Sequence, residues 1–391
     1  MATVALAGIA ALADATGVID VDVTFPSLGT GAERPTPTAA SVGEEIDPLA
    51  RYVDCVGGHD VNDGSTSRPL RSLQALARRL PANASVYLRR GCSWDGGLWI
   101  RRSAAGTTVQ PYGDGPAPVL TGTDVSRARG VVVVNAARVT LTGLHVRDAA
   151  GTGVEIRDTD ARVDGLEIER VAFGVTIKGA RAVVSRTRAH DLHMFTNTPG
   201  GSDDAGAVGF DVQADDVTIR NSSCVNCRAR SHDFGHDGGF VEVFNHGDRL
   251  RVVGNTSRNT QGFLEVGGVV EDGSAHDIVI ERNTISEAHG GVWVHRDDEF
   301  TIPARNIALV ENTLTSVSGE TLFGGRVSAL VLRDNVIVTP NHVSHFGPPA
   351  LHTGNRYHLT RRDRLGFHPD PTETVVPLTG VGAPLAPTSA R

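Results

Sequence analysis

The stretches RLRVVGNTS (249–257), DIVIERNTI (277–285), NIALVENTL (306–314) and ALVLRDNVI (329–337) decide the fold, because they repeat one pattern. Each has alternating β-branched or leucine residues, then a turn residue, then a second short strand. The same pattern occurs four more times toward the N-terminus, in RVTLTGLHV (138–146), ARVDGLEIE (161–169), AVVSRTRAH (182–190) and DVTIRNSSC (216–224). The chain therefore contains an internal repeat of short strands.

The spacing of the turn residues gives the length of the repeat. They lie 22, 21, 35, 34, 28, 29 and 23 residues apart, at Gly143, Gly165, Arg186, Asn221, Asn255, Asn283, Asn312 and Asn335. A base period of about 22 residues fits three short strands and is too short for a strand plus a full crossover helix. Asparagine tolerates the left-handed backbone conformation, and stacked amides can hydrogen-bond along the axis. The repeat predicts an all-β fold, a right-handed parallel β-helix.

The segment before the first repeat predicts a cap. A strand and a Gly/Asp/Asn-rich turn precede an amphipathic helix with Leu70, Leu73, Leu76, Ala77 and Leu80 on one face. Exposed strand edges at the end of a solenoid invite aggregation, so a helix over the open end is an expected N-terminal capping device.

The asparagine column and the cap segments YVDCVGGHDVNDGS (52–65) and PLRSLQAL (69–76) resemble bacterial right-handed β-helix proteins of the pectate-lyase-like superfamily. The resemblance covers residues 51 to about 340 and implies the fold rather than one activity. The stretches HDGGFVEVFN (236–245) and QGFLEVGG (261–268) are also similar to a recurring DGGGF-type segment of bacterial β-helix proteins.

The chain divides into four predicted parts. Residues 1–17 have the apolar, small-residue texture of an export signal but lack a positively charged start, so a truncated export signal and a disordered leader are alternatives. Residues 18–50 are predicted to be a linker or edge segment, and residues 51–340 the β-helix with its N-terminal cap. The proline-rich residues 341–391 are predicted to be a C-terminal cap and tail rather than further rungs.

Composition limits the partners and the compartment. The net charge of −8 argues against nucleic acid, and no stretch reaches the roughly 20 apolar residues of a membrane span. A disulfide between Cys55 and Cys92 would suit a secreted or cell-surface protein. Cys224 and Cys227 are predicted to be one buried and one surface thiol, because a second CxxC is absent. The oligomeric state stays open.

A second column marks the predicted site. The strands GVEI (153–156), GVTI (174–177), GFDV (209–212), FVEV (240–243), FLEV (263–266) and GVWV (291–294) align, with their last residues in the core. Side chains alternate along a strand, so the preceding residues face outward. The outward residues form a predicted ladder of Glu155, Thr176, Asp211, Glu242, Glu265 and Trp293.

Three consecutive carboxylates in this ladder predict acid–base chemistry. Like charges stacked at the strand spacing of about 4.8 Å repel and raise at least one pKa, which keeps a carboxylic acid protonated beside an ionised partner. Asp211, Glu242 and Glu265 are therefore the candidate catalytic residues of a glycoside hydrolase that cleaves a polysaccharide or oligosaccharide without a cofactor. The indole of Trp293 would stack on a sugar ring.

Two insertions, residues 190–206 and 228–239, lengthen the repeat just before this column, and insertions often decorate a functional face. They bring acidic and histidine side chains to the rim of the predicted groove. His232 and His236 lie on a glycine-rich loop, where ordinary surface histidines are expected more than zinc ligands. The predicted substrate-binding residues are Trp293, His232, His236, Asp237, Glu155 and His295.

Two other functions stay open. Lys178 follows Ile177 into the same groove, where a lysine beside Ca²⁺ could act as the base of a Ca²⁺-dependent polysaccharide lyase. The acidic column could instead be a Ca²⁺ site or a solvated stripe in a β-helix that binds glycan without cleaving it. The sequence does not choose a metal.

Overall fold

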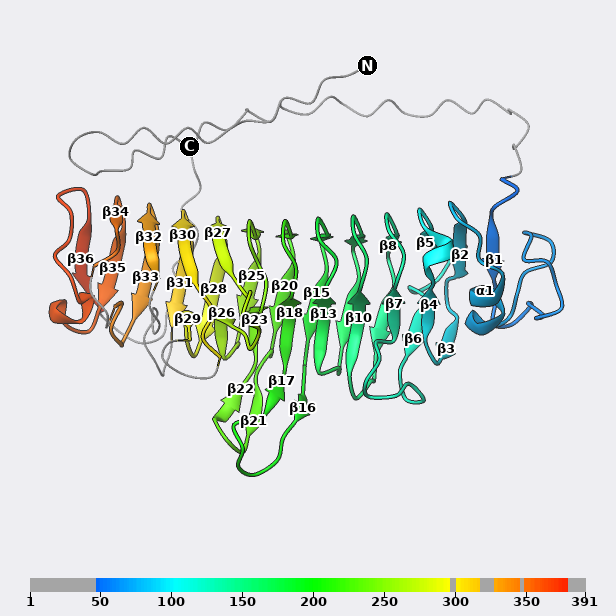
Figure 1. Ribbon diagram of the computed structural model, residues 1–391, viewed down its shortest axis with the longest axis horizontal. Coiled ribbons are helices and arrows are strands. Elements are labelled where there is room, and N and C mark those ends of the chain that lie inside the picture. The colour runs from blue at the N-terminus through cyan, green and yellow to red at the C-terminus, as the bar shows by residue number, and fades with distance from the viewer. Residues whose placement is uncertain (1–46, 296–299, 317–326, 345–347, 379–391) are drawn as a thin grey trace, which may run out of the picture. The chain divides into compact units, whose positions relative to one another are not determined.

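The structure is a computed structural model that describes residues 47–295, 300–316, 327–344 and 348–378. The predicted leader, residues 1–17, and nearly all of the predicted linker, residues 18–50, lie outside the described residues. From Arg51 onward the chain winds into a parallel β-helix, in which three long parallel sheets run side by side along the axis (Figure 1). The predicted all-β parallel architecture is confirmed.

Two of the sheets have twelve strands each. The first contains β1 (Arg51–Val53), β2 (Ser85–Arg89), β5 (Thr108–Tyr112), β8 (Thr140–Thr142), β11 (Arg162–Asp164), β14 (Val183–Ser185), β19 (Thr218–Arg220), β24 (Arg251–Val253), β27 (Ala275–Glu281), β30 (Ala304–Val310), β32 (Ser328–Arg333) and β34 (Leu351–Thr353). The second contains β3 (Ser93–Asp95), β6 (Val119–Thr121), β9 (His145–Arg147), β12 (Glu167–Glu169), β15 (Arg188–His190), β20 (Ser223–Val225), β25 (Thr256–Arg258), β28 (Thr284–Ala288), β31 (Thr313–Ser316), β33 (Val336–Thr339), β35 (Arg356–Leu359) and β36 (Thr374–Pro377).

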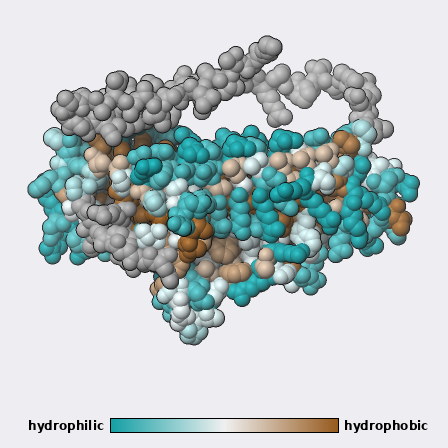
Figure 2. Space-filling view, viewed as in Figure 1, coloured by the Kyte–Doolittle hydropathy of each residue, from teal (hydrophilic) through white to brown (hydrophobic). Residues whose placement is uncertain are grey.

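The third sheet, called the ladder sheet below, has eight strands: β4 (Leu98–Ile100), β7 (Val132–Val134), β10 (Thr152–Ile156), β13 (Phe173–Ile177), β18 (Val208–Val212), β23 (Gly239–Phe244), β26 (Gly262–Gly267) and β29 (Val292–Val294). Two antiparallel hairpins precede its strands β18 and β23 and project from the β-helix in Figure 1. They are β16 (Met194–Thr196) with β17 (Ala205–Gly206), and β21 (Ala229–Ser231) with β22 (Gly235–Asp237). Figure 2 shows apolar residues gathered just above the hairpins on a mostly polar face.

The parallel sheets continue beyond residue 340, where the sequence predicted that the rungs would end. β34, β35 and β36 pair in parallel with β32, β33 and β35. The prolines predict a tail, but Pro377 ends the last strand of the second sheet. This is an edge position, where a missing N–H is tolerated.

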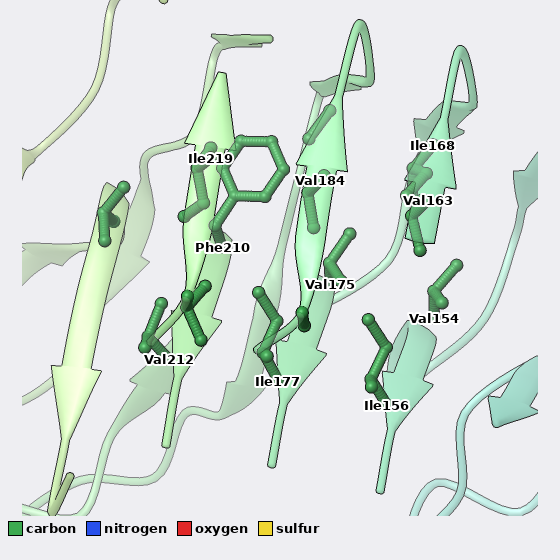
Figure 3. Close-up of a cluster of buried hydrophobic side chains, with 14 of the residues drawn as sticks. Val154, Ile156, Val163, Ile168, Val175, Ile177, Val184, Phe210, Val212 and Ile219 are labelled. Carbon is green, nitrogen blue, oxygen red and sulfur yellow. The ribbon is translucent and has the colours of Figure 1, made fainter. Parts of the chain in front are cut away.

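Rows of apolar side chains fill the interior. Figure 3 shows Val154, Val175 and Phe210 in one row and Ile156, Ile177 and Val212 in the next, and all six are fully buried. In-register pairing of β10, β13 and β18 places each side chain directly over its counterpart. Each such burial contributes about 1.5–3 kcal/mol, so the repeat itself supplies the core.

Stacked amides hold one corner of the β-helix, as the sequence predicted. Each asparagine after the first accepts from the backbone N–H and the side-chain amide of the preceding one, at 2.9–3.0 Å. This amide ladder consists of Asn255, Asn283, Asn312, Asn335 and Asn355.

The other predicted reason for asparagine at this corner, a left-handed backbone at the asparagine itself, is wrong. The left-handed backbone belongs to the residue before each asparagine, namely Gly254 (φ 65°), Arg282 (φ 53°), Glu311 (φ 55°) and Asp334 (φ 54°). Asn221 is itself left-handed, with φ 50°, and aligns with Gly254 rather than with Asn255. The ladder residues are therefore asparagines for their buried amide hydrogen bonds.

A short helix, α1 (Leu73–Arg79), follows the first strand and is N-capped by the Ser72 hydroxyl, which accepts from the Ala75 N–H. Leu73, Ala75 and Leu76 are its buried residues. Ala77 was predicted on the buried face but is only half-buried. The helix packs against β1 and β4, and its role as a cap stays a prediction.

Two disulfides tie the chain. Cys55 pairs with Cys92 beside the first strand, as the sequence allowed. Cys224 pairs with Cys227, so the expectation of one buried and one surface thiol is wrong. Both side chains point into the core and are fully buried, because the turn after β20 returns Cys227 to the interior. Among the described residues, no helix is long and apolar enough to cross a membrane.

Removing one rung of the amide ladder should destabilise the protein. Asn283→Ala leaves the Asn255 N–H and amide without their acceptor and the Val252 carbonyl without its donor, all of them buried. Unsatisfied buried groups of this kind should lower the free energy of unfolding by about 3 kcal/mol in guanidinium denaturation. The control Asn306→Gly removes one exposed side-chain hydrogen bond at a left-handed position. It should lower the free energy of unfolding by less than about 1 kcal/mol. Equal losses in the two variants would contradict a stabilising ladder.

Candidate active site

The predicted outward column is present in the register expected from the sequence. Glu155 pairs with Thr176, Thr176 with Asp211, Asp211 with Glu242, Glu242 with Glu265, and Glu265 with Trp293. Trp99 and Val133 extend the column toward the N-terminus. This column is called the acidic ladder below.

A bare strip runs beside the acidic carboxylates. Thr152 and Thr176 have their hydroxyls 3.5 Å apart, which shows that the residue three before each ladder position also faces outward. At β23 and β26 this position is glycine, Gly239 and Gly262, and a Cβ built on Gly262 meets no atom within 4 Å. The floor beside Glu265 is therefore open backbone at Gly262, whereas Gly239 beside Glu242 is buried.

Asp211 is buried, and only one of its oxygens is occupied. Gln213 donates to Oδ2 at 2.9 Å, whereas Oδ1 is buried without a hydrogen-bond partner in the described structure. Burial raises the pKa of Asp211 to about 6, against the lowering effects of the Thr176 and Gln213 side chains and the charge of Lys178. Asp211 is therefore about half protonated near pH 6, where an ordinary aspartate is almost fully ionised.

Glu242 and Asp237 also hold protons more tightly than ordinary carboxyl groups. Burial, with the nearby charges of Glu265, Asp211 and Asp237, raises the pKa of Glu242 well above its usual value. Burial and the charge of Glu265 raise the pKa of Asp237 to about 7. Three raised pKa values in one cluster are typical of catalytic carboxyl groups.

Gly238 brings Asp237 down to the ladder sheet. It has φ 117°, and a Cβ there would lie 2.7–2.9 Å from Ala207 and the Cys227 carbonyl, so only glycine fits. Asp237 ends β22 and accepts from the Gly238 N–H at 2.7 Å. The second hairpin thereby ends at Asp237, two residues before β23, where the charge of Asp237 acts on Glu242.

Gln261 and His289 lie shortly before β26 and β29, and Arg228 lies just before β21, where its charge acts on His236 and His289. Arg228 donates to Gln261 at 2.8 Å. Burial and the positive charge of Arg228 lower the pKa of both His236 and His289. Neutral imidazoles and an arginine thus lie close to one another.

The hairpins are braced against each other by carboxylates that are occupied. Asp204 accepts from Ser231 at 2.7 Å, from the Asp233 N–H at 3.0 Å and from the Thr198 N–H at 2.7 Å, and these bonds lower its pKa to about 2 despite burial. Asp233 accepts from the Gly200 and Asp203 N–H groups. His232 lies at the exposed tip of the second hairpin, where its N–H donates to Asn197, so the structure does not bring it to the acidic ladder.

Glu155 differs from the other ladder carboxylates because cations neutralise it. Arg157 donates to it at 2.7 Å and Lys178 lies 3.4 Å away. Burial opposes ionisation, but the hydrogen bond and charge of Arg157 and the charge of Lys178 lower the pKa of Glu155. The predicted substrate-binding residue Glu155 is thus buried in an ion-pair cluster, and Lys178 belongs to that cluster.

Trp293 and His295 end the ladder. The indole is 37% exposed, and its ring lies edge-on to the His295 ring with centroids 6.5 Å apart. His295 contacts Glu265, with Nε2 and Oε1 2.8 Å apart. An exposed aromatic face beside an acid with a histidine partner suits a sugar ring.

The closest cluster of carboxylates in the described part of the chain lies on the hairpins rather than on the ladder. Within the described residues, carboxylate oxygens converge closely at Asp203, Asp204 and Asp233, and these oxygens accept the hairpin hydrogen bonds described above. The ladder carboxylates are not among the convergent groups. A Ca²⁺ requirement stays a prediction.

Among the partners of the ladder, His295 was predicted from the sequence as a substrate-binding residue, whereas Arg157 and Gln213 were not. Each of the three lies two residues after a ladder residue, and strand alternation places it on the outward face. That signal was available for Arg157 and Gln213. The signal was not available for Arg228 and Gln261, which meet through the turns.

Comparison with known proteins identifies the fold. Residues 129–314 match the family model described as right handed beta helix region. The chain is a right-handed β-helix. Similar structures include XylC in complex with xylose (7% identity, 79% of this chain and 74% of that chain, TM-score 0.52). They also include a pectate lyase (13%, 83% and 79%, TM-score 0.49) and a lacto-N-biosidase from Eubacterium ramulus (12%, 84% and 67%, TM-score 0.46). No curated protein sequence matches. The predicted resemblance to pectate-lyase-like proteins is confirmed for the fold.

The raised pKa of Asp211 predicts a measurable dependence of stability on pH. The folded state binds this proton more tightly than the unfolded state, so stability from this residue falls as pH rises from about 4 to about 6 and is then constant. Asp211→Asn should therefore gain about 2 kcal/mol relative to the wild type between pH 4 and pH 7, measured by denaturant unfolding.

Glu155→Gln is the control of opposite sign. The pKa of Glu155 is lowered, so its stabilising effect is present above its unfolded pKa and is lost in acid. This variant should become less stable relative to the wild type as pH rises. Shifts of the same sign in both variants would contradict the assigned environments.

Proposed function

We propose that the chain is a glycoside hydrolase that cleaves a polysaccharide or oligosaccharide on the ladder sheet. One observation carries the proposal: the charges of Asp237, Glu242 and Glu265 act on one another, so these three acids cluster beside Gly239 and Gly262, and Trp293 follows Glu265 on the next rung. A glycosidic bond must be flanked by two carboxyl groups with different protonation states. The glycine strip provides space for the sugar chain, and the acids beside it provide the pair of carboxyl groups.

The pKa values divide the roles. Asp237, whose pKa is about 7, donates its proton to the glycosidic oxygen, and that oxygen leaves with the electron pair of the broken C–O bond. Glu265, next to His295, attacks the anomeric carbon or accepts the proton of the water that does so. Glu242 and Asp211 lie on the same column, and their raised pKa values reduce the negative charge beside Glu265.

The lyase alternative has less support. The Lys178 Nζ lies 3.4 Å from the Glu155 carboxylate, so it is already engaged by another ladder residue. The ion-pair cluster of Lys178 also lies on the opposite side of Asp211 from the glycine strip. The carbohydrate bound in the XylC structure agrees with a sugar ligand here, although the residues above carry the proposal. Two disulfides support export to an oxidising compartment as part of the same proposal.

An activity screen distinguishes the alternatives. Purified full-length protein is incubated with neutral and acidic polysaccharides, with Ca²⁺ or with chelator, and reducing ends and near-ultraviolet absorbance are read together. Hydrolysis predicts new reducing ends without absorbance and no effect of chelator. Absorbance that is lost with chelator would instead mean elimination, and binding without either signal would mean a non-catalytic glycan-binding protein.

Asp237→Asn and Glu265→Gln should each lower kcat/KM by about 10²–10⁴-fold, because each removes one proton-transfer or nucleophilic group. Wild-type activity should fall as pH rises through about 7, where Asp237 loses its proton, and Asp237→Asn should lose this limb. The matched control is Asp114→Asn, which removes an exposed carboxylate far from Asp237 in the sequence. This variant should retain activity. Full activity in Asp237→Asn would contradict the assignment of Asp237 as the general acid.

Trp293→Ala should act on binding rather than on chemistry. Loss of a sugar-stacking face should raise KM by about tenfold and leave kcat within about twofold. Trp293→Phe keeps an aromatic face and should recover most of the loss. A fall in kcat alone would show that the indole supports the ladder instead of the substrate.

A further inference from the structure

The outer face of the ladder sheet is divided by charge. Arg127, Arg129, Arg157 and Lys178 lie over its N-terminal rungs, β4 to β13. The carboxyl groups that hold raised pKa values lie over β18 and β23. Each step between rungs is about 4.8 Å, so β13 and β23 are separated by about 10 Å and β4 and β23 by about 24 Å.

The arginines of the loop 122–130 overlie this sheet. The Arg129 guanidinium lies 4.9 Å from the ring centroid of Trp99, a member of the ladder column. Arg127 lies 4.3 Å from the ring centroid of Phe195, which in turn packs against the outward residue Phe173 at 5.8 Å. A Cβ on Gly130 would lie 3.0 Å from the Glu155 side chain, which places the loop directly above β10.

These cations exceed the negative charge that they meet. Arg157 and Lys178 share Glu155. Arg127 and Arg129 are exposed and form no ion pair within the described residues. Guanidinium groups stacked on aromatic rings keep their N–H edges available for carboxylate or sulfate groups. The N-terminal half of the face therefore carries unbalanced positive charge on rigid supports.

We infer that the substrate is a mixed acidic and neutral glycan, whose acid groups bind over β4 to β13 while a neutral sugar lies at Glu242 and Glu265. The inference rests on the proposed function and specifies its substrate class. A chain of uronates would place a carboxylate against the acidic cluster, where like charges repel. A neutral polymer would leave the stacked arginines unused. A mixed polymer satisfies both halves.

Binding of three defined polymers tests the inference without requiring turnover. The probes are hyaluronan, in which glucuronate alternates with N-acetylglucosamine, polygalacturonate, in which every unit is acidic, and neutral dextran. Full-length protein should bind hyaluronan at least tenfold more tightly than the other two at low ionic strength, measured by calorimetry. Added salt should weaken this binding, because the contacts are between charges.

Arg127→Gln/Arg129→Gln should weaken hyaluronan binding at least tenfold and leave dextran unchanged. The control Arg162→Gln/Arg188→Gln makes the same charge change with exposed arginines of the other two sheets and should have no effect. Circular dichroism and unchanged melting verify folding. The inference is overturned if polygalacturonate or dextran binds as tightly as hyaluronan, if the two double variants behave alike, or if no probe binds.

Failure of the inference is separable from failure of the proposed function. Hyaluronan binding with the expected loss in Arg127→Gln/Arg129→Gln, but no new reducing ends on any polymer, would support the charge division and overturn hydrolysis. Hydrolysis of a neutral polymer at the same rate in the wild type and in this double variant would support hydrolysis and overturn the charge division.

Discussion

In-register stacking of parallel rungs is the constraint on which the rest of this structure depends. Each outward or inward position meets its counterpart at the strand spacing of about 4.8 Å, so one residue type is repeated along a column. Where the column is an amide, every group is both donor and acceptor, and the stack stabilises the corner. Where the column is a carboxylate, every group is an acceptor, and the same stacking destabilises the ionised state.

The chain resolves this conflict differently at each point. The amide ladder ends on a carboxylate: Glu373 accepts from Asn355 at 2.6 Å and from the Tyr357 hydroxyl at 2.9 Å, so the last donors are satisfied. Glu155 is compensated by cations. At Asp211 burial outweighs the charge of Lys178, and around Glu242 the nearby charges are acidic, so the pKa of both carboxyl groups is raised. These two carboxyl groups lie on the neighbouring rungs β18 and β23.

Periodicity predicted the part of the structure that stacking alone determines. The acidic ladder, the core rows and the hydrogen-bonded asparagines follow from strand alternation and a repeat of about 22 residues. The repeat did not fix the corner to one residue, because Asn221 sits where later rungs have glycine or a charged residue, and Ser222 takes the asparagine position. Hydrogen-bond geometry determines which residue of the corner takes the left-handed backbone, and a pattern of residue types does not predict that position.

The insertions were recognised from the sequence, but their chemistry was not. Asp237 and His232 were both expected at the rim of the groove. They are only five residues apart, but they lie in different environments. The hairpin turns His232 outward, and Gly238 returns the chain so closely to Ala207 that Asp237 reaches the sheet. The regular repeat places Asp211, Glu242 and Glu265 in one outward column. Asp237 lies outside that column because it comes from an interruption of the repeat, the second hairpin.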